Sequence, residues 1–368
     1  MAETATCSTI VWFERLALDD VPIVGGKNAS LGELIRQLGD AGVRVPNGFA
    51  TTAQAFRDFI TLSGIEPAMR DHIEHYRKEA VTLQDTGHAL RTLILASSLP
   101  DALVEDVCGA YAELAKRTAL QDPAVAVRSS ATAEDLPDAS FAGQHETFLN
   151  IRGEKALLDA CLRCFASLYT DRAISYREAK GFDHFSVALS VGVQQMVRAD
   201  LAGSGVMFSI DTETGFPGVA TISAAWGLGE TIVQGAVNPD RFVVFKPLLE
   251  QPGACPIIEK TLGDKAIRMV YSKEGGQQTK LVETTEAERG AFVLNDEEII
   301  ELARWAVAVE RHYGRPMDLE WAKDGDDGLL YLVQARPETV HGGKIGNNFR
   351  HYVLETNEQP IVSGVAIG

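Results

Sequence analysis

Apolar residues recur every three or four positions in several stretches of the chain, a spacing that places them on one face of a helix. The first such stretch, 28–38, follows the glycine pair Gly25 and Gly26. A second helix is expected after Thr51 or Thr52, and residues 66–120 read as mainly helical. The remaining predicted helices are 154–180, closed by Gly181, and 297–313, capped by Asn295 or Asp296 and ended by Gly314.

Strand patterns occur in both halves of the chain. Val125 and Val127 alternate with more polar neighbours, and a polar loop is expected over 129–144. Further strands are predicted at 187–197, 205–210, 219–223 and 241–245. Helices that alternate with strands indicate an α/β or α+β fold with at least two lobes.

The order of these elements suggests a division of the chain into three parts. We expect an N-terminal lobe over 1–195 and a C-terminal lobe over 196–340. Residues 341–368 read as a linker, and a new strand pattern starts at 360–367, where the chain ends. We therefore expect a further domain to follow this chain.

Composition narrows the class of partner. The 368 residues carry a formal net charge of −17, which disfavours nucleic acid and anionic membrane surfaces as partners. No apolar run approaches the length of a membrane span, and the N-terminus does not resemble a secretory signal. The five cysteines suggest no disulfide framework, and the lone pair Cys161 and Cys164 reads as packing on a helix. These features predict a cytoplasmic protein.

The segment 317–336 contains the most informative group of candidate functional side chains. It reads as a strand, a turn over 324–328 and a returning strand. We expect Lys323 to lie opposite Leu329, which places even-numbered residues of both strands on one face. That face then carries Asp318, Glu320, Gln334 and Arg336, and the opposite face carries Leu319, Trp321, Tyr331 and Val333.

Two interpretations of the polar face remain open. Carboxylate and amide oxygens suit Mg²⁺, which takes one or two protein carboxylates together with waters and substrate phosphates. A neighbouring guanidinium can hold phosphate with its planar fork. The combination is what phosphoryl transfer requires. The alternative is the solvated polar face of an antiparallel hairpin.

Two loops are candidate phosphate sites. Lys27 follows a glycine pair at a predicted helix N-terminus, where an anion is favoured, although the segment is no P-loop because Val21 and Asn28 occupy motif positions. Arg128 ends a predicted strand and precedes three hydroxyl side chains within 129–132. Each segment also has an interpretation without a ligand: Lys27 as a surface lysine in a loop, and Arg128 as part of an ordinary transition from strand to loop. The segment 227–230, ending in Glu230, is no dinucleotide fingerprint because Ile232 replaces the third glycine.

Taken together, these segments resemble the N-terminal nucleotide-binding domain of the phosphoenolpyruvate synthase and pyruvate phosphate dikinase family. The resemblance covers about residues 20–340. It implies a two-lobed ATP-grasp-like domain that binds Mg²⁺ and takes ATP as substrate between its lobes. The matching strings are VGGKNASLGEL, VPNGFATTAQAF, AVRSSATAEDLPDASFAGQHETFLN, GLGETIVQGAVNPD, GRPMDLEW and YLVQARPET.

The resemblance also implies residue roles. Lys27 and Arg128 correspond to a phosphate-binding pair, and Arg336 to a phosphate-contacting arginine, so Arg128 and Arg336 are the expected catalytic residues. Glu320 and Gln334 correspond to Mg²⁺ ligands, with Asp318 close by. The expected nucleotide contacts further include Gln195, Met196 and Val197, as a hinge beside adenine, and Glu230.

The synthase reaction of this family converts ATP, pyruvate and water to AMP, phosphoenolpyruvate and phosphate. ATP phosphorylates a histidine on a swivelling domain, which delivers the group to pyruvate in a barrel domain. Neither domain is recognisable in this sequence, and His341 lacks the expected context. The resemblance leaves open a homodimer of the full-length enzyme.

Three alternatives to the synthase remain. The strings DLPDASFAGQ and GAVNPD are more similar to the synthase than to the dikinase, which uses phosphate in place of water. They separate the synthase from rifamycin phosphotransferase poorly. A regulatory module that binds nucleotide without chemistry is the third alternative, and the carboxylate and amide face speaks against it.

Overall fold

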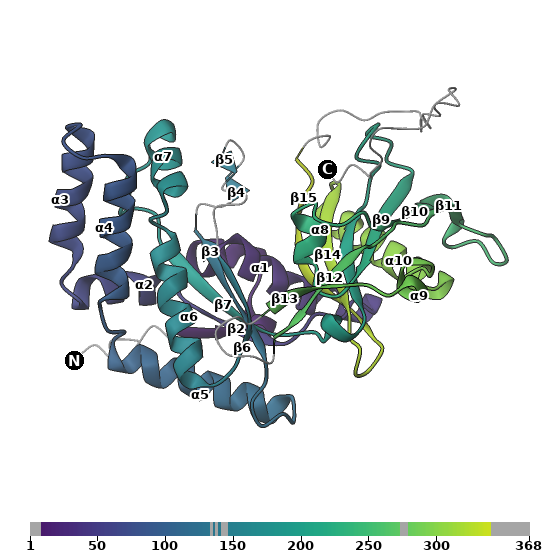
Figure 1. The fold of residues 1–368 in the computed structure, drawn as a ribbon, viewed down its shortest axis with the longest axis horizontal. Coiled ribbons are helices and arrows are strands. Elements are labelled where there is room, and N and C mark those ends of the chain that lie inside the picture. Colours follow the sequence, from purple (N-terminus) through teal and green to yellow (C-terminus); the bar gives the residue numbers. More distant parts are fainter. Residues whose placement is uncertain (1–8, 133–134, 137–138, 141–145, 273–278, 340–368) are drawn as a thin grey trace. The chain divides into compact units, whose positions relative to one another are not determined.

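The computed structural model describes residues 9–132, 135–136, 139–140, 146–272 and 279–339 (Figure 1). The chain divides into two compact units, one of Met1–Arg36 and Asn47–Met196 and the other of Gln37–Pro46 and Val197–Gly368. The expected linker at 341–368, with its strand pattern at 360–367, lies outside the described residues.

The first unit contains a five-stranded sheet in which all neighbouring strands are antiparallel. Alternate apolar residues build its core, and every residue of β3 is buried except Arg128. A separate short ribbon pairs β4 (Asp135–Leu136) with β5 (Ala139–Ser140). The strand order of the sheet is β1 (Ile10–Trp12), β2 (Gly48–Thr51), β7 (Leu189–Gln195), β3 (Val125–Ala131) and β6 (Thr147–Ile151).

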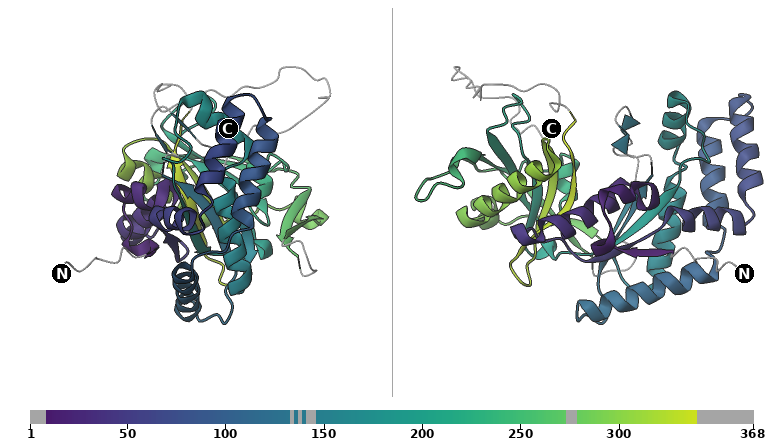
Figure 2. Two further views of the ribbon diagram at one scale, coloured as in Figure 1. Left: turned by 90° about the vertical axis from the view of Figure 1, so that its left-hand side faces the viewer. Right: turned by 180° about the vertical axis from the view of Figure 1, so that it is seen from behind.

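Helices pack on this sheet around one apolar cluster, in which Phe56 and Phe59 contact Phe165. Both views of Figure 2 show α3 and α4 side by side. The helix predicted over 154–180 is wrong as a single element, because Thr170 caps a new helix after a break. The helices are α1 (Val21–Leu38), α2 (Ala53–Leu62), α3 (Glu66–Arg77), α4 (Leu83–Leu95), α5 (Asp101–Arg117), α6 (Glu154–Ser167) and α7 (Asp171–Lys180).

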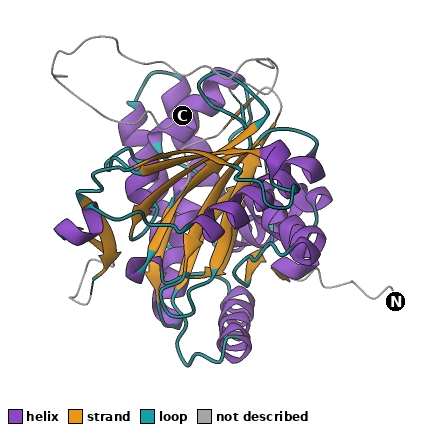
Figure 3. Ribbon diagram, turned by 90° about the vertical axis from the view of Figure 1, so that its right-hand side faces the viewer, coloured by secondary structure: helices purple, strands orange, loops and turns teal. Residues whose placement is uncertain are grey.

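The second unit contains a six-stranded sheet in which all neighbouring strands are antiparallel; Figure 3 draws the strands of both units in orange. Helix α10 (Asp296–Tyr313) packs on it, and Asn295 caps and Gly314 ends this helix as predicted. A separate ribbon pairs β12 (Ile267–Tyr271) with β13 (Thr279–Glu283). The sheet order is β11 (Ile257–Thr261), β10 (Asp240–Phe245), β9 (Val219–Trp226), β8 (Gly203–Phe208), β14 (Met317–Lys323) and β15 (Leu330–Pro337), and the short helices are α8 (Glu230–Val233) and α9 (Glu286–Arg289).

Arg44 explains why residues 37–46 belong to the second unit. The carbonyl oxygen of Arg44 accepts a hydrogen bond from the amide of Leu332 at 2.8 Å, and its Nε donates to the carbonyl of Leu330 at 3.0 Å. Its guanidinium also forms an ion pair with Glu301 at 2.6 Å and lies over the ring of Trp305. The segment is therefore bonded along the edge strand β15.

Helices combined with antiparallel sheets place the protein in the α+β class, one of the two classes that the sequence left open. The two units are compatible with the ATP-grasp-like architecture that the resemblance implies. Among the described residues, every helix is too short or too polar to cross a membrane.

Candidate functional site

The β14–β15 hairpin gathers polar side chains on one face, as the sequence predicts. Asp318 pairs with Arg336 and Glu320 pairs with Gln334 in the antiparallel register. Residues directly opposite each other in such a pair point to the same face of the sheet. Because Asp318 and Glu320 are two positions apart on one strand, all four side chains share that face.

The predicted register itself is wrong. Lys323 pairs with Leu330, and a bulge between Glu320 and Trp321 leaves Val333 as an extra residue on β15. An extra residue reverses the alternation of faces beyond it. Beyond the bulge, the buried residues of β15 are therefore Leu330 and Leu332, in place of Tyr331 and Val333.

Asp318 and Arg336 form an ion pair at the end of this face. Nε of Arg336 donates to Oδ2 of Asp318 at 2.7 Å, and Nη2 lies 2.7 Å from the same oxygen. Asp318 is 9% exposed, whereas about half of the Arg336 side chain is exposed. Burial raises the pKa of Asp318, and the carboxylates of Glu320 and Glu338 add to this against the opposing effect of Arg336. A bound cation would relieve this unfavourable charge.

The oxygen atoms of this face are of the kind that Mg²⁺ accepts as ligands. In the described part of the chain, no three acidic, histidine or cysteine side chains gather closely enough to hold a metal by themselves. The site therefore offers two carboxylates, from Asp318 and Glu320, and the amide oxygen of Gln334. Mg²⁺ binds through few protein carboxylates and completes its shell with waters and substrate phosphates, so this donor set suffices.

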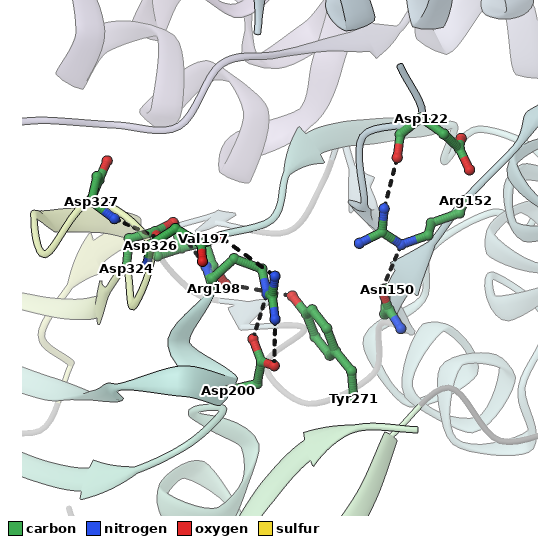
Figure 4. A network of polar contacts seen from close by, with 10 residues as sticks. All are labelled: Asp122, Asn150, Arg152, Val197, Arg198, Asp200, Tyr271, Asp324, Asp326 and Asp327. Carbon is green, nitrogen blue, oxygen red and sulfur yellow. Dashed lines mark hydrogen bonds and ion pairs between the residues drawn. The ribbon is translucent and has the colours of Figure 1, made fainter. Parts of the chain in front are cut away.

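Arg198 anchors the turn between the two strands of the hairpin (Figure 4). Its amide donates to Oδ2 of Asp324 at 3.0 Å, and its carbonyl accepts from the amide of Gly325 at 3.1 Å. Its guanidinium binds both carboxylate oxygens of Asp200, at 2.8 and 3.0 Å, and lies over the ring of Tyr271. Arg198, which directly follows the predicted hinge residue Val197, thus holds the hairpin in place within the second unit.

The predicted adenine hinge lies at the end of β7. The amides of Gln195 and Met196 donate to the carbonyls of Asn47 and Ala124, at 2.8 and 2.9 Å. An adenine contact through these two amides would have to replace those bonds. Val197 is buried, and its carbonyl accepts from the amide of Ala199. Contacts of these residues with adenine remain a prediction.

In the first unit, the glycine loop lies against the end of β3. Gly25 interrupts α1 with φ 74° and ψ 166°, so the helix that carries Lys27 begins directly after it. A Cβ atom on Gly25 would lie 2.3 Å from the Oγ and 2.6 Å from the carbonyl oxygen of Ser130. The structure therefore brings together two segments that the sequence identified separately, the Lys27 loop and the Arg128 strand.

Two of the three hydroxyl groups after Arg128 are engaged by the backbone of other segments. Strand β3 continues to Ala131, so Arg128 lies inside the strand and not at its end. The Ser129 hydroxyl contacts the backbone of Glu146, and the Thr132 hydroxyl contacts the backbone of Ala188. Ser129 and Ser130 are buried, whereas Arg128 is half-buried. The Ser130 hydroxyl makes no hydrogen bond with the described residues, and phosphate binding by Arg128 and this motif remains a prediction.

Glu230 is the first residue of α8 and is half-buried. The loop before it is fixed by two bonds of the Gly227–Leu228 dipeptide: Ser204 Oγ donates to the carbonyl of Gly227 at 2.6 Å, and the amide of Leu228 donates to Met269 at 2.9 Å. The role of Glu230 in nucleotide binding remains a prediction.

A buried ion pair, not predicted from the sequence, organises the second unit. Asp240 and Lys265 are both fully buried and form an ion pair. Asp240 also accepts from the amides of Gly263, at 3.0 Å, and Val293, at 2.9 Å. The sequence signal was the string GAVNPD, which ends in Asp240. The pair joins three segments that lie far apart in the chain.

The cysteine pair is buried in α6, where it was expected to be a packing element. Cys161 is 1% exposed, and burial raises the pKa of its thiol to about 12. Burial also raises the pKa of Cys164. Both thiols are therefore protonated and poorly reactive at neutral pH.

Comparison with known proteins places these features in a family. The family model described as "Pyruvate phosphate dikinase, AMP/ATP-binding domain" matches residues 21–353. The chain is 54% identical to the phosphoenolpyruvate synthase of Synechocystis sp., over 98% of the chain and 45% of that protein. It is 50% identical to that of Escherichia coli, over 100% of the chain and 46% of that protein, and 40% identical to that of Pyrococcus furiosus, over 90% and 44%. The chain spans somewhat less than half the length of these relatives. The chain therefore belongs to the family of pyruvate phosphate dikinase AMP/ATP-binding domains.

Proposed function

We propose that this chain binds Mg²⁺ and ATP, and that the enzyme containing it makes phosphoenolpyruvate from pyruvate. The observation that carries the proposal is the shared face of Asp318, Glu320, Gln334 and Arg336, which combines metal-binding oxygens with a phosphate-binding guanidinium. The names of similar proteins, phosphoenolpyruvate synthases from several organisms, support the choice of product.

Each residue of the hairpin has a distinct part in this proposal. Glu320 and Gln334 hold Mg²⁺, with Asp318 beside them, and the bound ion supplies charge neutralisation at the phosphates. Arg336 binds a phosphate oxygen, and its contact with Asp318 fixes the plane of the guanidinium. An oriented guanidinium loses less rotational freedom when phosphate arrives.

The first unit supplies Lys27 and Arg128 as phosphate-binding cations in this proposal. Both lie in a chain of net charge −17, so local positive charge is needed to attract a polyanion. The proposed nucleotide contacts also include Gln195, Met196, Val197 and Glu230.

The wider reaction is proposed from the family. ATP phosphorylates a histidine of a swivelling domain, and that histidine phosphorylates pyruvate, in a cytoplasmic enzyme. The named relatives favour the synthase over rifamycin phosphotransferase and over the dikinase. The metal-binding face favours catalysis over a purely regulatory module, because adenine nucleotide can be bound without a metal site.

Titration calorimetry with ATP, with and without Mg²⁺, tests the proposal. We expect Mg²⁺ to tighten ATP binding and Glu320→Gln to remove that gain. Glu297→Gln is the matched control, because Glu297 is an exposed carboxylate in the first turn of α10. Glu320→Gln and Gln334→Ala should be non-additive if both hold one ion. Negligible heat under both conditions, or equal effects of the two Glu→Gln changes, would contradict the proposal.

A further inference from the structure

Asn28 is buried next to the proposed phosphate-binding residue Lys27. It is 2% exposed, and its Nδ2 donates to the carbonyl of Val24 at 3.0 Å and to Ser190 Oγ at 2.9 Å. The first bond spans the interruption at Gly25, and the second joins α1 to β7. A buried amide that made neither bond would lose its hydration without compensation.

The bonds of Asn28 continue into the sheet. Ser190 Oγ donates to the carbonyl of Thr51 at 2.6 Å, and the amide of Val191 donates to Thr51 Oγ1 at 2.9 Å. Asn28, Ser190 and Thr51 are each almost completely buried. The start of the Lys27 helix is therefore connected to both β2 and β7 by a hydrogen-bonded network that solvent does not reach.

The same contacts connect Lys27 with Arg128. A Cβ atom on Gly192 would lie 2.1 Å from Oδ1 of Asn28, so the amide lies directly on the backbone of β7 there. Gly192 is the residue that pairs with Arg128 across β3 and β7, and Ser190 pairs with Ser130. Lys27 is thus bordered on one side by Gly25, against Ser130, and on the other by Asn28, against Gly192.

We infer that Asn28 is a positioning residue for nucleotide binding. It fixes the backbone of Lys27 relative to the strand that carries Arg128, so that both cations are held ready for one polyphosphate. The inference rests on the proposed function, because it assumes that Lys27 binds phosphate. A supporting residue of this kind acts through geometry, since a binding group displaced by about 1 Å loses much of its effect.

The experiment is a double-mutant cycle on ATP affinity in the 368-residue chain, measured by calorimetry with Mg²⁺. Asn28→Ala and Ser190→Ala are each combined with Lys27→Ala. We expect either neutral substitution to raise the Kd for ATP about tenfold, the value of roughly one net hydrogen bond. In the Lys27→Ala background this loss should disappear, because the residue being positioned is gone.

A stability control separates positioning from general loosening of the unit. Thr170 caps α7, because its Oγ1 accepts a hydrogen bond from the amide of Ala173 at 3.3 Å. Thr170→Ala removes this cap. It should lower thermal stability without changing the Kd for ATP. Hydrogen exchange of β7 peptides monitors folding of every variant, and Ser190→Ala alone carries the cycle if Asn28→Ala does not fold.

Three results would overturn the inference. Equal losses of affinity with and without Lys27 would show that Asn28 acts by another route. Normal affinity in Asn28→Ala and Ser190→Ala, with weakened affinity in Lys27→Ala, would overturn the inference and leave the proposed function intact. Absence of ATP binding by the unsubstituted chain would overturn both.

Discussion

Gly25→Ala tests the close contact between the glycine loop and β3. The backbone conformation at Gly25, φ 74° and ψ 166°, is accessible almost only to glycine, and a side chain there costs about 1–3 kcal/mol in strain. The new Cβ would also lie 2.6 Å from the carbonyl oxygen of Ser130, so backbone must move, at a further cost of about 1–3 kcal/mol. We therefore expect the free energy of unfolding of the first unit to fall by about 2–6 kcal/mol.

Gly181→Ala is the matched control for this change. Gly181 ends α7 with φ 72°, and a Cβ atom there would meet nothing within 4 Å. Its substitution therefore introduces backbone strain alone, about 1–2 kcal/mol. Both changes lie in the first unit, which isolates the contact with Ser130 as the difference between them.

Hydrogen exchange of β3 and β7 peptides in urea is the assay, because a chain with two units need not unfold in one step. ATP affinity is measured in parallel. We expect Gly25→Ala to cost more stability than Gly181→Ala and to weaken ATP binding, while Gly181→Ala leaves the affinity unchanged. Equal stability losses would refute the contact between the glycine loop and β3.

Three further changes have defined outcomes. Arg336→Ala should weaken ATP binding about tenfold or more in calorimetry, and it should also lower the melting temperature, because the buried carboxylate of Asp318 loses its ion pair; Arg336→Lys should recover only part of the affinity. Asp240→Ala should cost about 3–5 kcal/mol in the second unit, measured by hydrogen exchange of β10, because Lys265 is left buried and unpaired; adding Lys265→Met should recover most of it. His184 is buried in the first unit, where its ring nitrogens contact Nε of Arg177 at 3.0 Å and Oε1 of Glu178 at 2.6 Å. Burial, together with the charge of Arg177, lowers the pKa of His184 against the opposing effect of the Glu178 hydrogen bond, so the unfolded chain gains this proton at higher pH than the folded one. Stability should fall as the pH drops below about 6.5, and melting curves of His184→Gln should show a smaller decline between about pH 7 and 5.

Local signals predicted several elements correctly, because their causes lie within a few residues. Helix α10 begins at a side-chain cap, Asn295, and ends at Gly314 in the left-handed conformation, and both residue types were recognisable. The shared face of Asp318, Glu320, Gln334 and Arg336 followed from alternation along two strands joined by a short turn. Neither prediction needed information from distant parts of the chain.

Other features depend on contacts between distant segments. The bulge at Val333 occurs where Leu332 bonds to Arg44, a residue far away in sequence that brings 37–46 into the second unit. Strand β3 extends to Ala131 because β7 pairs with it along its whole length. The polar residues that follow Arg128 had indicated a loop there.

The sequence by itself determined the candidate residues, since each motif is a local pattern of polar groups, glycines and strand alternation. The tertiary structure decided which of them meet and which polar groups are already engaged. It placed Gly25 against Ser130, connected Asn28 to Ser190, and engaged the hydroxyl of Ser129 with the backbone of Glu146. Such pairings depend on the packing of segments more than a hundred residues apart, or across a loop, and no local pattern encodes them.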